Sequence, residues 1–268
     1  MSVVLSQLFV YPVKSATGIA LPAARVDARG LEHDRRWMVV DPTGMLVTLR
    51  ERPDLAHVRT RLGVDCLRLD APGMPPLELP LVLATGTPTI AIMWTTPVDA
   101  LVVEAATAWI STYLAGDYRL VYMPDSSDRP YHDRTDTPLS FVDGNPLSLV
   151  SEASLDDLNG RLAEPVDLRN FRHNLIVSGC EAYAEDGWET IKIGSLRLER
   201  LGACVRCMLV NVDPDTGTHG REPLRTLAQY RRSGQEVHFG VLYRIASGIS
   251  STLSCGDTVT FGDLHGAA

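Results

Sequence analysis

The chain has 268 residues, 45% hydrophobic and 22% charged, which suits a globular protein of one or two domains. Its net charge of -8 argues against a general nucleic-acid or acidic-membrane binder, and its ordinary composition argues against disorder. No stretch approaches the roughly 18 apolar residues of a membrane span, and the first residues lack the basic segment of a secretory signal.

Most of the chain is predicted to form short strands, beginning with the apolar N-terminal segment. Residues 36–40 and 45–49 flank a turn that contains Pro and Gly, which predicts a hairpin. Residues 191–193 and 196–198 flank Gly-Ser and predict a second hairpin. The other expected strands are 172–177 and 237–245.

Three segments predict helices, at residues 103–114, 151–162 and 222–230. Ser151 is expected to cap the second helix rather than to act as a nucleophile, because no G-x-S-x-G pattern surrounds it. The polar segment 125–137 is expected to be a loop or a linker, which places a domain boundary near residue 120. The sequence therefore predicts a mainly β fold with a few helices (α+β), with domains at 1–120 and 121–268.

The cysteines suggest both a compartment and a site. Their odd number indicates a reducing cytoplasm rather than a disulfide scaffold; they are Cys66, Cys180, Cys204, Cys207 and Cys255. Cys204 and Cys207 form a C-x-x-C pair that could share a metal, act as a redox dithiol, or simply be two buried apolar side chains. A zinc site would need a second ligand pair, which the sequence lacks.

Residues 208–212 predict a strand, and residues 212–217 predict a tight turn that would hold this strand in place.

Cationic side chains give two further candidates. Only two of the 25 basic residues are lysines, Lys14 and Lys192. Lys14 and Ser15 could bind a phosphate together with nearby backbone N–H groups, although no Walker pattern is present and a solvated lysine is the alternative. Arg35 and Arg172 lie near aromatic residues in sequence, so they could grip an anion and stack on a flat ring, or else cover apolar surface.

These segments together resemble one family. Residues 11–15 (Tyr-Pro-Val-Lys-Ser) and 34–37 (Asp-Arg-Arg-Trp) resemble the N-terminal β-barrel domain that accompanies MOSC domains. The MOSC domain itself is named after the molybdenum cofactor sulfurase C-terminus. The segments that resemble it are residues 151–159, 170–172, 206–207, 212–217 and 222–224. The order and spacing run from residue 3 to about 264 and are most similar to the mitochondrial amidoxime-reducing component and its bacterial relatives.

The resemblance implies a molybdenum cofactor (Mo-molybdopterin) between the two parts, with the thiolate of Cys207 as the metal ligand and catalytic group. The implied cofactor-binding residues are Lys14, Ser15, Arg35, Gly144, Asn145, Asn170, Arg172 and Arg206. Relatives often carry hydroxyl residues where this chain has Gly144 and Asn145, and Cys204 is given no catalytic role. Pyridoxal phosphate binding is also implied by the resemblance, without an assigned residue.

The implied activity is the reduction of an N-hydroxylated or N-oxide-type small molecule in the cytoplasm, with no nucleic-acid partner and no membrane span. Some bacterial relatives carry a ferredoxin-like domain with four cluster-binding cysteines, which this sequence lacks, so a separate redox protein is expected to supply electrons. One alternative is a module that carries sulfur or the molybdenum cofactor without turnover. Another is a redox dithiol formed by Cys204 and Cys207.

Overall fold

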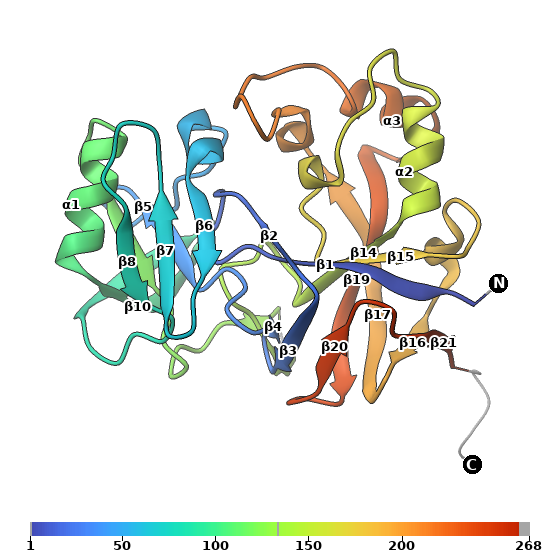
Figure 1. Cartoon of the computed structure of the whole chain (residues 1–268), viewed down its shortest axis with the longest axis horizontal. Helices are drawn as coiled ribbons and strands as arrows, with labels where there is room; N and C mark the ends of the chain where they lie inside the picture. The colour runs from blue at the N-terminus through green and yellow to red at the C-terminus, as the bar shows by residue number, and fades with distance from the viewer. Residues whose placement is uncertain (1, 133, 263–268) are drawn as a thin grey trace.

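The protein is built as two lobes that lie side by side (Figure 1). The computed structural model describes residues 2–132 and 134–262. The lobe on the left of Figure 1 consists mainly of residues 37–122, and the other lobe is formed around one large sheet. The first strand of the chain pairs within that large sheet, so the chain starts in one lobe, builds the other, and then returns.

The large sheet has nine strands and closes into a barrel. Its strands are β1 (Val4–Val10), β2 (Ile19–Leu21), β14 (Leu147–Ser151), β15 (Leu175–Ser178), β16 (Thr190–Ile193), β17 (Leu196–Arg206), β18 (Arg232–Ser233), β19 (Glu236–Ser247) and β21 (Val259–Phe261). Their order is β2-β1-β15-β14-β19-β17-β16-β21, with β18 paired to β19. Leu5 N donates to Asp257 O and Val259 N donates to Val3 O, both at 2.8 Å, so the segment at β21 is bonded back to the segment at β1 and the sheet closes.

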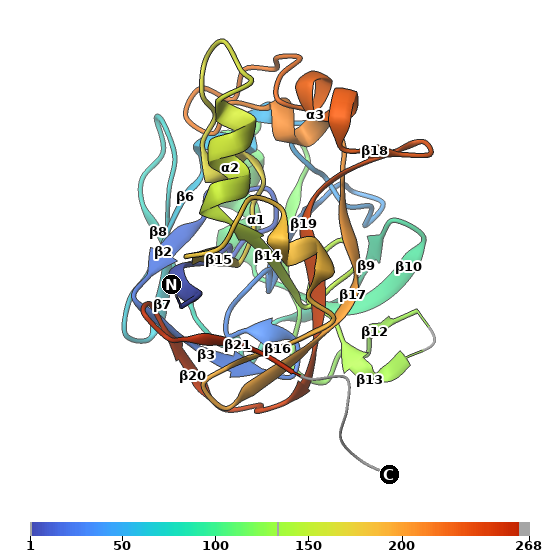
Figure 2. The same cartoon turned by 90° about the vertical axis from the view of Figure 1, so that its right-hand side faces the viewer.

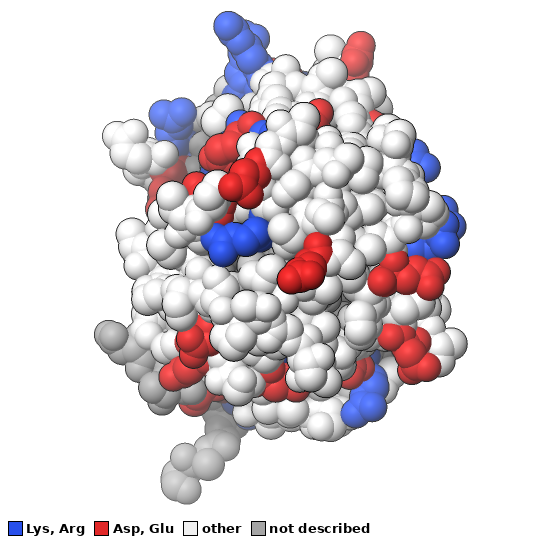
Figure 3. Space-filling view, turned by 90° about the vertical axis from the view of Figure 1, so that its left-hand side faces the viewer, with Lys and Arg blue, Asp and Glu red and all other residues white. Residues whose placement is uncertain are grey.

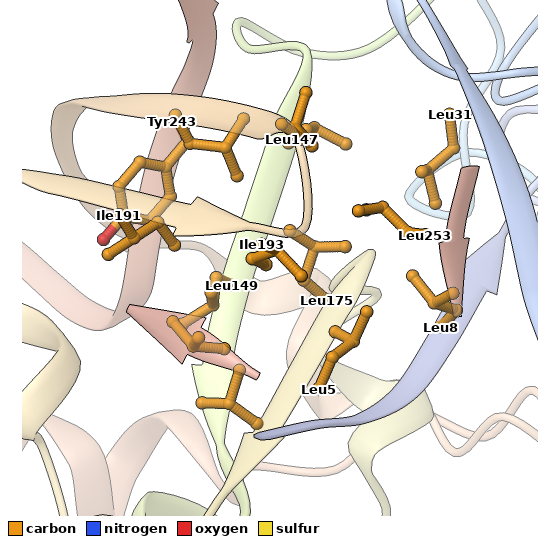
Figure 4. Packing of buried hydrophobic residues seen from close by; sticks show 14 of the residues in the cluster. Leu5, Leu8, Leu31, Leu147, Leu149, Leu175, Ile191, Ile193, Tyr243 and Leu253 are labelled. Carbon is orange, nitrogen blue, oxygen red and sulfur yellow. The ribbon is translucent and has the colours of Figure 1, made fainter. Parts of the chain in front are cut away.

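Apolar residues fill the barrel because alternate side chains of each strand point inward. Leu147 and Leu149 of β14 and Leu175 of β15 lie in the interior cluster shown in Figure 4, together with Leu5 and Leu8 of β1. The intervening residues of these strands face outward. There they pack in a second cluster with residues of α2 (Glu152–Asn159) and α3 (Leu224–Tyr230). Figure 2 shows these two helices at the same end of the barrel.

The smaller lobe is a four-stranded sheet that is buried on both faces. It is formed by β5 (Trp37–Val40), β9 (Thr87–Met93), β10 (Thr96–Val102) and β11 (Arg119–Tyr122), in the order β5-β11-β10-β9. One face packs against α1 (Glu104–Tyr113) and against a three-stranded sheet of β6 (Arg59–Leu62), β7 (Cys66–Asp70) and β8 (Leu77–Pro80). Trp37 and Val39 of β5 belong to this core, whereas Met38 and Val40 belong to the core on the other face.

Short elements complete the fold. Two small sheets consist of β3 (Ala23–Asp27), β4 (Gly30–Leu31) and β20 (Thr252–Ser254), and of β12 (Pro130–Tyr131) and β13 (Arg134–Pro138). The 3-10 helices are η1 (Pro53–His57), η2 (Leu168–Asn170), η3 (Ala184–Gly187) and η4 (Met208–Asn211). The predicted fold class, mainly β with a few helices, is confirmed.

Several predicted elements are confirmed and three are corrected. All three helices form, Ser151 caps α2 by accepting a hydrogen bond from Ser154 N, and the hairpin of β16 and β17 has the expected partners. Residues 45–49 do not form a strand, because β5 pairs with β11 instead and only an isolated bridge joins Val40 to Leu46. The polar segment 125–137 contains the strand pair β12–β13, and residues 208–211 form η4 rather than a strand.

The outer surface carries charges of both signs. Figure 3 shows the end of the molecule formed by the smaller lobe, where acidic side chains are scattered between uncharged ones and basic side chains are fewer. Within the described residues, no helix combines the length and the apolar character needed to cross a membrane. All five cysteines are free thiols.

Candidate functional site

A cleft of about 400 Å³ lies between the two lobes, and its walls come from both. Residues 14–15, 35 and 48–50 line it from the N-terminal side, and residues between 142 and 242 line it from the barrel side. Every site residue predicted from the sequence lines this one cleft: Lys14, Ser15, Arg35, Gly144, Asn145, Asn170, Arg172, Arg206 and Cys207. The fold therefore gathers residues that are up to 193 positions apart (207 minus 14) in one place.

Two arginines of the cleft stack on the ring of one tyrosine. The guanidinium carbons of Arg35 and Arg172 lie 4.1 Å and 4.3 Å from the ring centroid of Tyr11. The Tyr11 ring is buried, and its hydroxyl donates to His173 O at 3.1 Å. Burial raises the pKa of Tyr11 to about 12 and, with the neighbouring charge of Arg35, lowers the pKa of Arg172 to about 10. In the structure these two arginines contact the flat ring of Tyr11, which sequence reasoning did not single out.

The backbone at these positions is unusual. Ser15, Arg35 and Arg172 have φ values of 71°, 48° and 56°, which lie in the left-handed region that side chains other than glycine rarely adopt. Each such residue costs on the order of 1–3 kcal/mol, and such residues concentrate at functional sites. Hydrogen bonds hold the conformations: Arg35 N donates to Tyr11 O at 2.8 Å, and Arg172 Nη1 donates to Ala16 O at 2.6 Å.

Lys14 is fixed at the edge of the cleft. Its ammonium donates to Asp143 Oδ1 at 2.7 Å and to Phe141 O at 3.1 Å. Burial lowers the pKa of Lys14, and the ammonium of Lys14 holds the pKa of Asp143 below its ordinary value. The Asp143 side chain itself opens into the cleft with 67% of its surface exposed. The next residue, Gly144, has no atom within 4 Å of where a Cβ would stand, so the cleft has free space there.

Cys207 places its thiol at the exposed end of β17, where the strand gives way to η4. Arg50 Nη2 donates to Cys207 Sγ at 3.0 Å, and the same guanidinium lies 5.2 Å from the ring centroid of Trp94. Arg50 comes from the smaller lobe and Cys207 from the barrel, so this contact spans the cleft. Cys204 is buried, and burial raises the pKa of its thiol.

Asn170 holds the segment that follows the exposed cysteine. Its side-chain amide donates to Val210 O at 3.0 Å and to Val212 O at 3.1 Å. Its side-chain oxygen accepts from Asp167 N at 3.2 Å, completing a capping box on η2. These bonds occupy both ends of the Asn170 amide, so the residue shapes the wall of the cleft by fixing η4.

Arg206 is likewise fixed by its surroundings. Its guanidinium donates to Phe239 O and Phe171 O, both at 2.9 Å, and lies 2.5 Å from Nε2 of the buried His173. Burial and the charge of Arg206 hold the pKa of His173 well below its ordinary value, so the imidazole is neutral and accepts from the guanidinium.

Sequence reasoning missed several residues that line the cleft: Thr48, Arg50, Asp143, Ser148, Asn174 and Leu242. Arg50 shows why, because its contact with Cys207 joins positions 157 residues apart and no local pattern marks it. Asn174 and Asp143 each lie within a few residues of a predicted site residue, so proximity in sequence was a usable signal for those two.

The charges in the cleft suit an anionic ligand. Among the residues that the structure describes, five cations line it (Lys14, Arg35, Arg50, Arg172 and Arg206) against a single carboxylate, although the whole chain is acidic. Within residues 2–132 and 134–262, no group of three or more His, Cys, Asp or Glu side chains could hold a metal ion alone.

Comparison with known families identifies both parts of the chain. Residues 2–117 match the MOSC N-terminal beta barrel domain, and residues 136–260 match the MOSC domain. The chain belongs to the MOSC family. Human mitochondrial amidoxime-reducing component 1 is 39% identical to this MOSC protein over 246 residues, covering 85% of this chain and 72% of the human protein.

Other relatives carry the same kind of name. Mitochondrial amidoxime reducing component 2 of Bos taurus is 34% identical over 95% of this chain and 82% of its own length. Among solved structures, the YUAD protein of Bacillus subtilis covers 97% of this MOSC protein and 94% of its own chain, at 10% identity and a TM-score of 0.42. The predicted family is thus confirmed by sequence relatives at 33–39% identity.

Proposed function

We propose that this MOSC protein is a molybdenum-cofactor-dependent oxidoreductase that reduces N-hydroxylated compounds with electrons from a separate redox protein. The observation that carries the proposal is the convergence of one exposed thiol and five cationic side chains in a single cleft between the lobes. The names of the relatives, amidoxime-reducing components, suggest the substrate class.

The residues of the cleft fit the cofactor. A soft thiolate is a suitable protein ligand for a metal whose other sulfur ligands come from the pterin. Lys14, Arg35 and Arg172 would hold the anionic phosphate and the pterin, because ammonium and guanidinium groups make charge-assisted hydrogen bonds to phosphate. Within the described part of the chain, the guanidinium of Arg172 donates only to Ala16 O, so most of its N–H donors remain available to a ligand.

The net reaction consumes two electrons and two protons: R–C(NH₂)=NOH + 2 e⁻ + 2 H⁺ gives R–C(NH₂)=NH + H₂O, with cleavage of the N–O bond. When bound, the cofactor supplies the two-electron redox chemistry. The protein supplies the ligand thiolate of Cys207, which Arg50 orients from the opposite wall through its hydrogen bond to Sγ. Asn170 keeps that cysteine in place by fixing the segment that follows it.

The test compares two cysteines of the same C-x-x-C pair. Protein is made in a host that synthesises the cofactor, and molybdenum, pterin and benzamidoxime reduction by reduced methyl viologen are measured together. Cys207→Ala is expected to lose its molybdenum, and its activity is expected to fall more than about 100-fold. That fall exceeds the 10–100-fold that is typical when a residue that only hydrogen-bonds to a metal ligand is removed. The matched variant Cys204→Ala is expected to retain both, because Cys204 is a buried apolar contact.

Two outcomes would contradict the proposal. A Cys207→Ala protein with normal molybdenum and full activity would show that the thiolate is not the ligand. Wild-type protein that carries a stable persulfide on Cys207, holds no pterin and reduces no amidoxime would instead be a sulfur carrier.

A further inference from the structure

A second hollow, which we call the arginine groove, opens on the barrel beside the cleft. It has a volume of about 520 Å³ and is lined by β17, η4, α3, β18 and the start of β19. Figure 2 shows α3 and β18 together at one end of β17 and β19. Val205 and Arg206 line both the groove and the cleft, so the groove reaches the residues next to Cys207.

The groove is strongly basic on a chain that is acidic as a whole. Arg221, Arg225 and Arg232 line it and are exposed, and Arg206 lies at its inner end. None of these arginines has a carboxylate within 4.0 Å among the residues that the structure describes, whereas Arg231 beside them is paired with Asp186 at 2.6 Å. Unpaired cations held together in this way create a local positive potential.

The acidic residues near the groove already have partners. Glu236 is the one carboxylate in the described lining of the groove, and its Oε2 lies 3.2 Å from Nε2 of His238. Glu222 accepts a hydrogen bond from Thr226 N at 3.0 Å at the start of α3. Four arginines against one carboxylate in the described lining give the groove a net positive charge.

The groove is physically coupled to the exposed thiol. Asn211, the last residue of η4, accepts a hydrogen bond from Leu224 N at 2.9 Å and so ties the segment after Cys207 to α3. Val205 and Met208, on either side of the C-x-x-C end, are 47% and 52% exposed. Exposed apolar side chains beside a basic groove suit a weak and transient protein encounter.

We propose that the arginine groove is the docking surface for an acidic, one-electron redox protein that delivers electrons to the cleft. This inference rests on the proposed function, because it takes the need for an external donor as given. Two donor molecules are each oxidised by one electron for every N–O bond reduced. The acidic remainder of the surface repels such a donor, so the field of the molecule orients the donor towards the groove.

The experiment uses the holoenzyme and two kinds of electron donor. Plant-type ferredoxin and flavodoxin, both acidic, are kept reduced by ferredoxin–NADP reductase and NADPH, and benzamidoxime reduction is followed as the donor concentration rises. Reduced methyl viologen, a small cation that needs no docking surface, is the second donor. The groove variant is Arg225→Glu with Arg232→Glu. Its matched control is Arg59→Glu with Arg61→Glu, which reverses two exposed arginines on β6 of the other lobe.

The groove variant is expected to raise the KM for the acidic donors at least about tenfold at low salt, with unchanged activity towards methyl viologen. The control should leave both rates as in the wild type, and added salt should reduce the difference. Equal donor KM values for the groove variant and the wild type would overturn the inference, as would a wild type that accepts neither protein. Loss of binding to anionic lipid vesicles with an unchanged donor KM would identify a membrane contact instead. A wild type that does not reduce benzamidoxime with reduced methyl viologen would contradict the proposed function itself.

Discussion

The stacking of two arginines on Tyr11 allows a quantitative prediction about stability. A desolvated cation–π contact contributes about 2 kcal/mol, so the two contacts at 4.1 Å and 4.3 Å together contribute about 4 kcal/mol. The hydroxyl bond to His173 O adds about 1 kcal/mol. Tyr11→Phe should therefore cost about 1 kcal/mol, whereas Tyr11→Leu should cost about 5 kcal/mol, because it also removes the aromatic ring that both guanidinium groups contact.

Thermal unfolding followed by circular dichroism measures the difference. At about 2–4 °C per kcal/mol for a chain of this size, Tyr11→Phe should lower Tm by about 3 °C and Tyr11→Leu by at least about 10 °C. Tyr113 is the matched control, since its hydroxyl donates to Asp54 O at 2.9 Å. Its Phe and Leu variants should lower Tm by a few degrees at most. Equal losses for Tyr11→Phe and Tyr11→Leu would refute the idea that the ring stabilises the two charges.

Two further predictions concern the residues around the thiol. Because the pKa of His173 is held well below its ordinary value, the folded protein keeps it neutral while the unfolded chain protonates it near pH 6.5. Its contribution to stability is thus present above that pH and is lost as the pH falls below it, by about 1.4 kcal/mol per unit. Urea unfolding at pH 7.5 and 5.5 should show that the free energy of unfolding falls less on acidification for His173→Gln than for the wild type. An equal fall in both proteins would contradict this prediction. Asn170→Ala removes two bonds to the segment after Cys207 and should cost about 2 kcal/mol in urea unfolding. It should also lower amidoxime reduction more than it lowers molybdenum content, and full activity would disprove the positioning role.

Local rules explain why much of the fold could be predicted. The helix cap at Ser151 and the hairpin of β16 and β17 depend on residues close in sequence, and both form as predicted. The strand predicted at 208–212 failed for the opposite reason. Its apolar residues suit a strand, but Asn170, about 40 positions earlier, binds the carbonyls of Val210 and Val212 and stabilises η4 instead.

The candidate site was predicted from family motifs rather than from chemistry visible in single residues. Those motifs named residues that all line one cleft, although their roles toward a cofactor, the boundary near residue 120 and the cytoplasmic location stay predictions. Contacts made across the two lobes, such as Arg50 with Cys207, could not be predicted, because their geometry exists only when both lobes are folded. The arginine groove could not be predicted from the sequence either, since its residues are spread from 205 to 237.

The closure of the barrel has a consequence for how the protein is made. Residues 37–122 find most of their partners within the same stretch and can fold as soon as they leave the ribosome. β1 must wait, because its neighbours are β15 and the segment around Asp257, which are synthesised much later. Lys14 and Ser15 follow β1 directly, so the cleft is assembled only near the end of synthesis. On the proposed function, cofactor capture would therefore be a late, post-translational event, and we expect a chain truncated before residue 257 to have an open barrel and an incomplete cleft.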